Sequence, residues 1–195
     1  SAPINLYGAT KLASDKLFVA ANNSYRGQED VRFSVVRYGN VFGSRGSVVP
    51  YFLSKKENEV IPITHEKMTR FNITIEECVN FTLNALQKML GGEIFIPKMP
   101  SYRLLDLKEA IVPKNRIQNI GIRPGEKLHE EIVTIADSLN TIDCGSYYVI
   151  LPSINFLPKK KYDEKNKINS VSCEYGFTYN SFNNKSWLSV NELKI

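Results

Sequence analysis

The stretch RFSVVRYGNVFGSRGSVVP, residues 32–50, decides the fold class of this chain. Its first seven residues are rich in β-branched and aromatic side chains, which predicts a strand over residues 32–38. The glycine-punctuated residues 39–46 predict a loop, and VVPYFLSKK from residue 48 predicts a helix whose first turn tolerates Pro50. A strand, a loop and a helix in this order form the repeating unit of α/β proteins.

The same alternation continues on both sides of this stretch. Apolar residues recur at helical spacing over residues 10–22, and a capping box of Thr74 with Glu77 predicts the start of a helix that ends at Gly91. The other expected strands are residues 62–64, 70–73, 93–97, 117–122 and 147–152, and the other expected helices are residues 104–112 and 124–133. This order predicts an α/β chain with a parallel sheet in its first part and smaller α/β units after it.

The amino-terminal end of the chain predicts an incomplete sheet. A parallel sheet needs helices on both faces, and one helix with one strand cannot supply them. The chain also begins at Ser1, without an initiator methionine. We therefore expect the earlier strands of this sheet to precede Ser1.

Composition excludes several classes of protein. With 43% hydrophobic and 23% charged residues, the chain is expected to be globular. It has no apolar run of about 20 residues and no signal peptide, so we expect a soluble, cytoplasmic protein with no membrane partner. The formal charge of +5 is scattered, and its one dense run, residues 159–161, is interpreted as a solvated loop rather than a nucleic-acid site. Three cysteines without a C-x-x-C pattern indicate reduced thiols, and with only two histidines no metal site is expected.

A tyrosine and a lysine near the start of the chain are candidates for catalysis. In INLYGATK, residues 4–11, Tyr7 and Lys11 are four apart and share one face of the expected helix. A phenol is a poor base near neutral pH unless a cation stabilises its phenolate, which Lys11 could do. Tyr51 and Lys55 have the same spacing, so the pattern alone permits this chemistry without establishing it.

Four motifs in a fixed order carry a resemblance to a known family. They are PINLYGATK (residues 3–11), SVVRYGNVFGSRGSVVP (34–50), MTRFNIT (68–74) and GIRPGEKLHEE (121–131), with a weak continuation in NNKSWL (183–188). Together they resemble the extended short-chain dehydrogenase/reductase family, and more narrowly its inverting UDP-N-acetylglucosamine 4,6-dehydratases, which begin pseudaminic acid synthesis. Tyr7 and Lys11 lie inside the first motif, whereas Tyr51 and Lys55 lie outside the matched positions.

The resemblance implies a fold and a division into domains. It implies the carboxyl-terminal part of a Rossmann-like doubly wound parallel sheet with a smaller α/β substrate-binding domain. Residues 1–47 would end the dinucleotide-binding domain, residues 48–151 would mainly bind the UDP-sugar with some return to the sheet, and residues 152–195 would form a polar tail.

The resemblance also assigns roles to individual residues. Tyr7 and Lys11 would be catalytic and would contact the cofactor, whose nicotinamide end would also lie along Val41, Phe42, Gly43, Ser44 and Arg45. The expected UDP-sugar contacts are Asn40, Val48, Thr64, Arg70, Arg123, Glu126 and Asn183. A guanidinium matches phosphate oxygens with a planar fork of donors, so Arg70 and Arg123 are the expected diphosphate ligands. Glu126 would accept hydrogen bonds from ribose hydroxyls.

The implied activity is NADP- or NAD-dependent dehydration of UDP-N-acetylglucosamine with inversion at C5, in an enzyme that is a homo-oligomer when full length. No two of the 11 glycines are spaced G-x-G, so we expect most of the cofactor site, and part of the catalytic set, to lie before Ser1. Two alternatives stay open. One is a UDP-sugar 4-epimerase or a retaining 4,6-dehydratase, and the other is a non-catalytic fragment that binds a nucleotide sugar.

Overall fold

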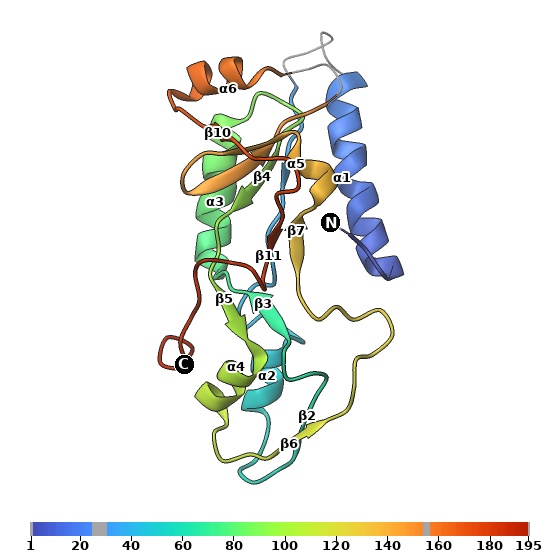
Figure 1. The fold of residues 1–195 in the computed structure, drawn as a ribbon, viewed down its shortest axis with the longest axis vertical. Helices are drawn as coiled ribbons and strands as arrows, with labels where there is room; N and C mark the ends of the chain where they lie inside the picture. Colours follow the sequence, from blue (N-terminus) through green and yellow to red (C-terminus); the bar gives the residue numbers. More distant parts are fainter. Residues whose placement is uncertain (1, 25–30, 154–156, 195) are drawn as a thin grey trace. The chain divides into compact units, whose positions relative to one another are not determined.

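The computed structural model describes residues 2–24, 31–153 and 157–194, and it divides the chain into two compact units. Unit 1 comprises Ser1–Tyr38, Val79–Lys98 and Glu131–Tyr179. Unit 2 comprises Gly39–Cys78, Met99–Glu130 and Asn180–Ile195. Figure 1 traces the elements of each unit in sequence order.

A five-stranded sheet forms the centre of unit 1. The strand order is β1-β4-β9-β8-β10, with β1 parallel to β4 and the other neighbours antiparallel. Its strands are β1 (Val35–Val36), β4 (Ile94–Pro97), β8 (Thr141–Asp143), β9 (Tyr147–Ile150) and β10 (Val171–Ser172). The other elements are helices α1 (Leu6–Ser24), α3 (Ile75–Lys88, which begins in unit 2), α5 (Ile135–Ser138) and α6 (Lys159–Asn166), and strand β7 (Glu131–Val133).

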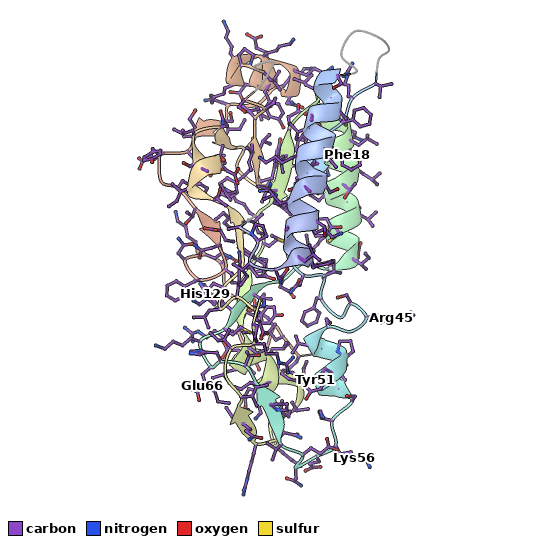
Figure 2. The ribbon with its side chains drawn as sticks, turned by 90° about the vertical axis from the view of Figure 1, so that its right-hand side faces the viewer. Phe18, Arg45, Tyr51, Lys56, Glu66 and His129 are labelled. Carbon is purple, nitrogen blue, oxygen red and sulfur yellow. The ribbon has the colours of Figure 1, made fainter. Side chains whose placement is uncertain are left out.

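Aromatic side chains fill much of the core of unit 1. Phe95 of β4 and Tyr147 of β9 lie with ring centroids 6.4 Å apart, and the fully buried ring of Tyr162 from α6 is 6.4 Å from Phe95. The ring centroid of Phe18 in α1 (Figure 2) lies 6.2 Å from that of Phe33, which precedes β1. Helices α6 and α1 are therefore packed on the sheet through aromatic contacts.

One arginine ties three elements of unit 1 together. The Arg37 side chain donates to the Asp15 carboxylate of α1 through Nε at 3.0 Å and Nη2 at 2.8 Å. Its Nη1 donates to the Ile132 carbonyl of β7 at 2.8 Å and lies 3.4 Å from the Asp137 carboxylate of α5. Because these side chains are largely shielded from water, this network positions α1 and α5 against the sheet.

Unit 2 consists of two short helices and two strand pairs. The helices are α2 (Val48–Leu53) and α4 (Leu104–Ile111), and the strands are β2 (Ile61–Ile63), β3 (Thr69–Phe71), β5 (Ser101–Arg103) and β6 (Ile117–Asn119). Strand β2 runs parallel to β6, and β3 runs antiparallel to β5. Phe52, Ile61 and Leu107 are fully buried in the apolar core that joins both helices to β2. The last strand of the chain, β11 (Tyr179–Asn180), pairs with β7.

Most elements expected from the sequence are confirmed. Helices form at α1, α2, α3 and α4, and Pro50 lies in the first turn of α2. The capping box is present, because the Thr74 amide donates to the Glu77 carboxylate at 2.7 Å and the Glu77 amide donates to Thr74 Oγ1 at 3.2 Å. The two parallel strand pairs, β1 with β4 and β2 with β6, agree with the predicted α/β class.

Two expectations about elements are wrong. Residues 124–133 do not form a helix: Pro124 and Gly125 form a turn in which Gly125 has φ +78°, irregular chain follows, and β7 begins at Glu131. The helical spacing of apolar residues here is overridden by hydrogen bonds to β3. The run at residues 159–161 is not a loop but the first turn of α6, where Lys159 pairs with Asp163 at 2.8 Å.

The described residues were also searched for membrane-spanning helices, metal-binding clusters and disulfides. Within residues 2–24, 31–153 and 157–194, no helix has the length and apolar character needed to cross a membrane. The same part of the chain holds no cluster of three or more His, Cys, Asp or Glu side chains arranged to bind a metal ion. The three cysteines are free thiols, as expected from their spacing.

Candidate functional site

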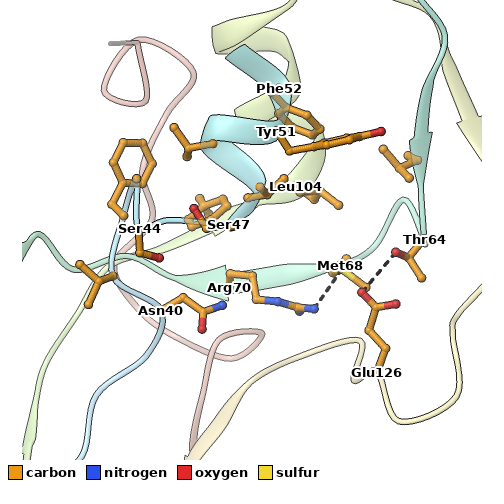
Figure 3. Close-up of a pocket in the computed structure, with 18 of the residues that line it drawn as sticks. Asn40, Ser44, Ser47, Tyr51, Phe52, Thr64, Met68, Arg70, Leu104 and Glu126 are labelled. Carbon is orange, nitrogen blue, oxygen red and sulfur yellow. Dashed lines mark hydrogen bonds between the residues drawn. The ribbon is translucent and has the colours of Figure 1, made fainter. Parts of the chain in front are cut away.

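A cavity of about 630 Å³ lies within unit 2 (Figure 3). Its wall is built from the loop after β1, from helix α2, from β2 and β3, and from the irregular segment before β7. The charged side chains on the wall are three arginines and one glutamate, so the cavity is suited to an anionic ligand. The predicted site residues on its wall are Asn40, Val41, Phe42, Gly43, Ser44, Arg45, Val48, Thr64, Arg70, Arg123 and Glu126.

The loop at residues 39–47 is shaped by two consecutive turns. The Ser44 amide donates to the Val41 carbonyl at 3.2 Å, and the Ser47 amide donates to the Ser44 carbonyl at 3.0 Å. Gly43 and Gly46 have φ of +71° and +78°, and a Cβ at either position would have no neighbour within 4 Å. The two glycines are therefore needed for their backbone conformation rather than for close approach of another group.

Gly39 places the start of this loop against β3. A Cβ on Gly39 would lie 2.8 Å from the Phe71 Cβ, which is closer than two such atoms can approach. The next residues continue this contact, because the Phe42 amide donates to the Ile73 carbonyl at 2.8 Å. Asn40 is thereby placed on the cavity wall, near Arg70 in the view of Figure 3.

Tyr51 of α2 also lines the cavity, which the sequence did not predict. It follows Val48 by three residues and therefore shares a helix face with that predicted contact, a signal present in the sequence. The Lys55 Nζ lies 4.8 Å from the centroid of the Tyr51 ring. Tyr51 therefore lies on the wall of the site although it is outside the matched motif positions.

Thr64 and Glu126 meet on the cavity wall, to the right of Asn40 and Arg70 in the view of Figure 3. Thr64 Oγ1 donates to Glu126 Oε1 at 3.3 Å. Glu126 Oε2 is buried and has no hydrogen-bond partner among the described residues. A buried carboxylate oxygen without a partner is costly, so a ligand hydroxyl that donates to it would be stabilised.

The three arginines on the wall differ in their surroundings. Arg45 and Arg123 are exposed, and Figure 2 shows the Arg45 side chain directed away from the chain. Arg123 begins the turn in which the Glu126 amide donates to the Arg123 carbonyl at 3.0 Å. Arg70 is different, because its guanidinium donates to backbone carbonyls of Thr69, Lys127 and Leu128.

Ionisable groups surround Arg70. Burial raises the pKa of the Glu130 carboxyl, an effect that the hydrogen bond from the Phe71 amide and the charge of Arg70 oppose. Burial and, to a smaller extent, Glu130 raise the pKa of Tyr102 to about 12, so this tyrosine on the cavity wall is a neutral phenol. Burial and the charge of Arg70 lower the pKa of His129, which favours the neutral imidazole.

Tyr7 and Lys11 lie in the first turns of α1, in unit 1. Both side chains are exposed, Tyr7 to 73%, and the Lys11 Nζ is 5.5 Å from the centroid of the Tyr7 ring. This contact closely matches that between Lys55 and Tyr51. The local geometry of the pair therefore follows from the spacing and does not by itself indicate catalysis.

Asn183 stays a prediction. It is exposed, and it is not among the described residues that line the cavity. The side chain of its neighbour Asn184 donates to the carbonyls of Met99 and Ser186 and to Ser101 Oγ, so it stabilises the carboxyl-terminal segment.

The fold and the cavity define a class of protein. Residues 1–152 match the model of the polysaccharide biosynthesis protein family, and the chain belongs to this family. Pen from Bacillus thuringiensis, whose X-ray structure is known, superposes with a TM-score of 0.82 at 35% identity over 99% of this chain and 57% of that chain. This match shows that the α/β fold is Rossmann-like.

The chain is similar to individual enzymes that act on UDP-sugars. The chain is 50% identical to the inverting UDP-N-acetylglucosamine 4,6-dehydratase of Campylobacter jejuni subsp. jejuni serotype O:2, over 98% of this chain and 58% of the relative. It is 34% identical to the UDP-glucose 4-epimerase of Rickettsia felis, over 98% of this chain and 56% of that protein. The resemblance to the inverting dehydratases is thus confirmed. The chain spans somewhat more than half the length of these curated relatives.

Proposed function

We propose that the protein carrying this chain is an NAD(P)-dependent UDP-N-acetylglucosamine 4,6-dehydratase that inverts C5, and that it supplies a 4-keto-6-deoxy sugar nucleotide for pseudaminic acid and surface glycan synthesis. The observation that carries the proposal is the cavity of unit 2. It brings together residues from well-separated parts of the chain for which the family resemblance implies UDP-sugar binding, namely Asn40, Val48, Thr64, Arg70, Arg123 and Glu126. The identity to the Campylobacter enzyme supports this substrate.

The chemistry of the wall is matched to the parts of a UDP-sugar. Arg123 is exposed at the cavity and would bind the diphosphate, with the charges of Arg45 and Arg70 contributing. Glu126, oriented by Thr64, would accept from ribose hydroxyls through Oε2. Asn40 and Val48 would contact the sugar half of the ligand.

Each unit, taken by itself, offers groups of the kind that contact one end of a nicotinamide dinucleotide. Tyr7 and Lys11 offer an exposed phenol and ammonium on one helix face, and residues 41–45 offer a turn-rich backbone. When bound, NADP or NAD would accept hydride from C4 of the sugar and return it to C6. The residues named here contact only the nicotinamide end of the dinucleotide, so they do not discriminate between NAD and NADP.

Tyr7 would move a proton in this reaction. It would take the proton of the C4 hydroxyl as the ketone forms, with the Lys11 ammonium stabilising the phenolate. The ketone acidifies the C5 proton, which permits elimination of water across C5 and C6. Reprotonation of C5 from the opposite face would invert that centre, and residues outside this chain would supply the acid and base for the elimination.

An experiment on the full-length protein tests the proposal. Incubation with UDP-N-acetylglucosamine and dinucleotide in D₂O should give a 4-keto sugar that has lost one water and carries deuterium at C5. The coupling constants between its ring protons, measured by NMR, should be those of the sugar with inverted configuration at C5. The similarity to the Rickettsia epimerase supports a second candidate, a UDP-sugar 4-epimerase, which would give a C4 epimer with no loss of water. Retention at C5 would indicate a retaining dehydratase, and binding without turnover would indicate a non-catalytic nucleotide-sugar-binding protein.

A further inference from the structure

The segment that carries Arg123 and Glu126 has no regular structure of its own. Between β6, which ends at Asn119, and β7, which begins at Glu131, the chain forms neither helix nor strand. The turn at Pro124 and Gly125 provides one internal hydrogen bond, from the Glu126 amide to the Arg123 carbonyl. A segment of this kind is positioned by whatever satisfies its other backbone groups.

Strand β3 supplies those partners. The Thr69 amide and Arg70 Nη1 both donate to the Leu128 carbonyl at 3.1 Å. Arg70 Nη2 donates to the Lys127 carbonyl, also at 3.1 Å. One guanidinium thus binds the carbonyls of the two residues that directly follow Glu126.

The remaining N–H groups of Arg70 are also directed at protein atoms. Nη1 donates to the Thr69 carbonyl at 2.7 Å and Nη2 to Met68 Sδ at 3.1 Å, so each of the four hydrogens on the two Nη atoms has an acceptor. Nε faces Glu130 Oε1 at 4.0 Å. In this arrangement the donors that a phosphate would require are engaged with the chain itself.

The anchoring continues to the start of β7. Thr69 Oγ1 lies 2.8 Å from His129 Nδ1, and the Phe71 amide donates to Glu130 Oε2 at 2.8 Å. Residues 127 to 130 therefore each have a hydrogen bond to β3, and Arg70 makes two of them. Their sequence separation of 57 to 60 residues means that this contact depends entirely on the tertiary fold.

We propose that Arg70 is a positioning residue, which ties the Lys127–Leu128 backbone to β3 and thereby fixes Glu126 and Arg123 at the cavity. This inference rests on the proposed UDP-sugar site and deepens it. It differs from a direct phosphate contact in one measurable respect. A positioning residue affects every part of the ligand that Glu126 or Arg123 holds, including the ribose, whereas a phosphate ligand affects only ligands that carry phosphate.

A ligand series separates the two roles. Binding of uridine, UDP and UDP-N-acetylglucosamine to the protein is measured by ligand-observed NMR for wild type, Arg70→Gln, Arg70→Ala and Arg123→Ala. We expect Arg70→Ala to weaken uridine binding by about 5- to 10-fold, as loss of an oriented carboxylate contact would, and Arg123→Ala to leave uridine affinity unchanged. Arg123→Ala should weaken UDP binding by roughly 10- to 150-fold. Arg70→Ala with unchanged uridine affinity and weakened UDP binding would overturn the proposal in favour of a direct phosphate ligand.

A readout without ligand covers the case in which the alanine variant is unstable. The Thr69 amide donates to Leu128 in the same contact, so its hydrogen exchange should accelerate in Arg70→Gln, which keeps one planar donor group but cannot reach both carbonyls. The Phe42 amide, which donates to Ile73, serves as the matched control and should keep its exchange rate. Equal protection of the Thr69 amide in wild type and Arg70→Gln would overturn the proposal. Wild-type protein that binds no UDP would instead contradict the proposed function.

Discussion

Two tyrosines of this chain show what spacing does and does not decide. Tyr7 and Tyr51 each have a lysine four residues later, and each lysine Nζ lies over its tyrosine ring, at 5.5 Å and 4.8 Å. The contact is a property of the helix, because residues i and i+4 share a face. Any difference in chemistry must come from the ligands that the two phenols can reach.

Replacement of Tyr7 by phenylalanine should separate chemistry from binding. Tyr7→Phe removes only the hydroxyl that would exchange a proton with the sugar, so turnover in the full-length protein should fall by roughly 10²-fold or more. UDP-N-acetylglucosamine affinity should change little, because the proposed binding residues are intact. Steady-state kinetics and calorimetry measure the two quantities.

A suitable control is Tyr175→Phe, since Tyr175 is exposed to 77% and belongs to no motif. It should change neither turnover nor affinity. Full turnover in Tyr7→Phe would show that INLYGATK is only the start of a helix and that the proposed proton transfer is wrong.

His129 should make the stability of unit 2 depend on pH. Burial lowers the pKa of His129 in the folded chain, so as the pH falls the unfolded chain takes up a proton first. The stability due to neutral His129 is therefore present above about pH 6.5, the ordinary imidazole pKa, and is lost as the pH falls toward the folded-state pKa. Denaturant unfolding from pH 8 to pH 5 should show wild type losing more stability below pH 6.5 than His129→Gln. If the stability of the two proteins changed with pH in the same way, His129 would not be the source of the pH dependence.

At the scale of elements, Arg37 joins α1, β7 and α5, and its removal should destabilise unit 1. Arg37→Met would leave the Asp15 and Asp137 carboxylates without their shared cation, and breaking a largely buried ion pair on one side costs about 3 kcal/mol. For a chain of this size we expect a fall in melting temperature of roughly 6 to 12 °C.

A matched comparison is Lys114→Met, which breaks an exposed pair with Glu57. Exposed pairs contribute about 0 to 1 kcal/mol, so this variant should melt close to wild type. Similar melting temperatures for Arg37→Met and wild type in calorimetry would show that the Arg37 network does not hold these elements together.

Local signals predicted the elements that local forces stabilise. Helix α3 begins at its capping box because the side chain of Thr74 accepts from the Glu77 amide and the side chain of Glu77 accepts from the Thr74 amide. Neither hydrogen bond needs a residue from a distant part of the chain. Strands β4 and β9 follow from their runs of apolar residues, which are buried in the sheet. The helix expected at residues 124–133 failed because its backbone carbonyls at Lys127 and Leu128 accept from β3 instead.

The sequence predicted only part of the candidate site, because some of its residues are brought to the cavity by tertiary contacts. Most of the cavity residues inside the motifs were identified from the resemblance that the motifs carry, including Asn40 and Glu126, whereas Ser47 lies inside the second motif and was not identified. Tyr51 and Tyr102, which lie outside the motifs, also line the cavity, but only the helix face shared by Tyr51 with Val48 could have indicated one of them. Tyr102 reaches the cavity through its pairing with Arg70 across β5 and β3, which no local pattern encodes.

At the scale of the whole molecule, the chain should bind one ligand of the proposed reaction and not the other. The cavity that we propose binds UDP lies within unit 2, whereas no G-x-G-x-x-G loop to hold a dinucleotide pyrophosphate occurs in the 195 residues. Calorimetric titration of this chain should therefore detect UDP and show no useful affinity for NADP. Micromolar binding of NADP to these 195 residues would contradict the prediction, with UDP as the positive control.

The sequence by itself determined the α/β alternation, the family and most of the polar residues of the cavity, because periodicity, caps and ordered motifs are properties of neighbouring residues. Only the tertiary structure decided that Thr64 orients Glu126, that Tyr102 lines the cavity, and that the donors of Arg70 are directed at Lys127 and Leu128. The physical reason is the distance along the chain. Hydrogen-bond partners 57 to 62 residues apart are chosen by packing, and packing depends on every element at once.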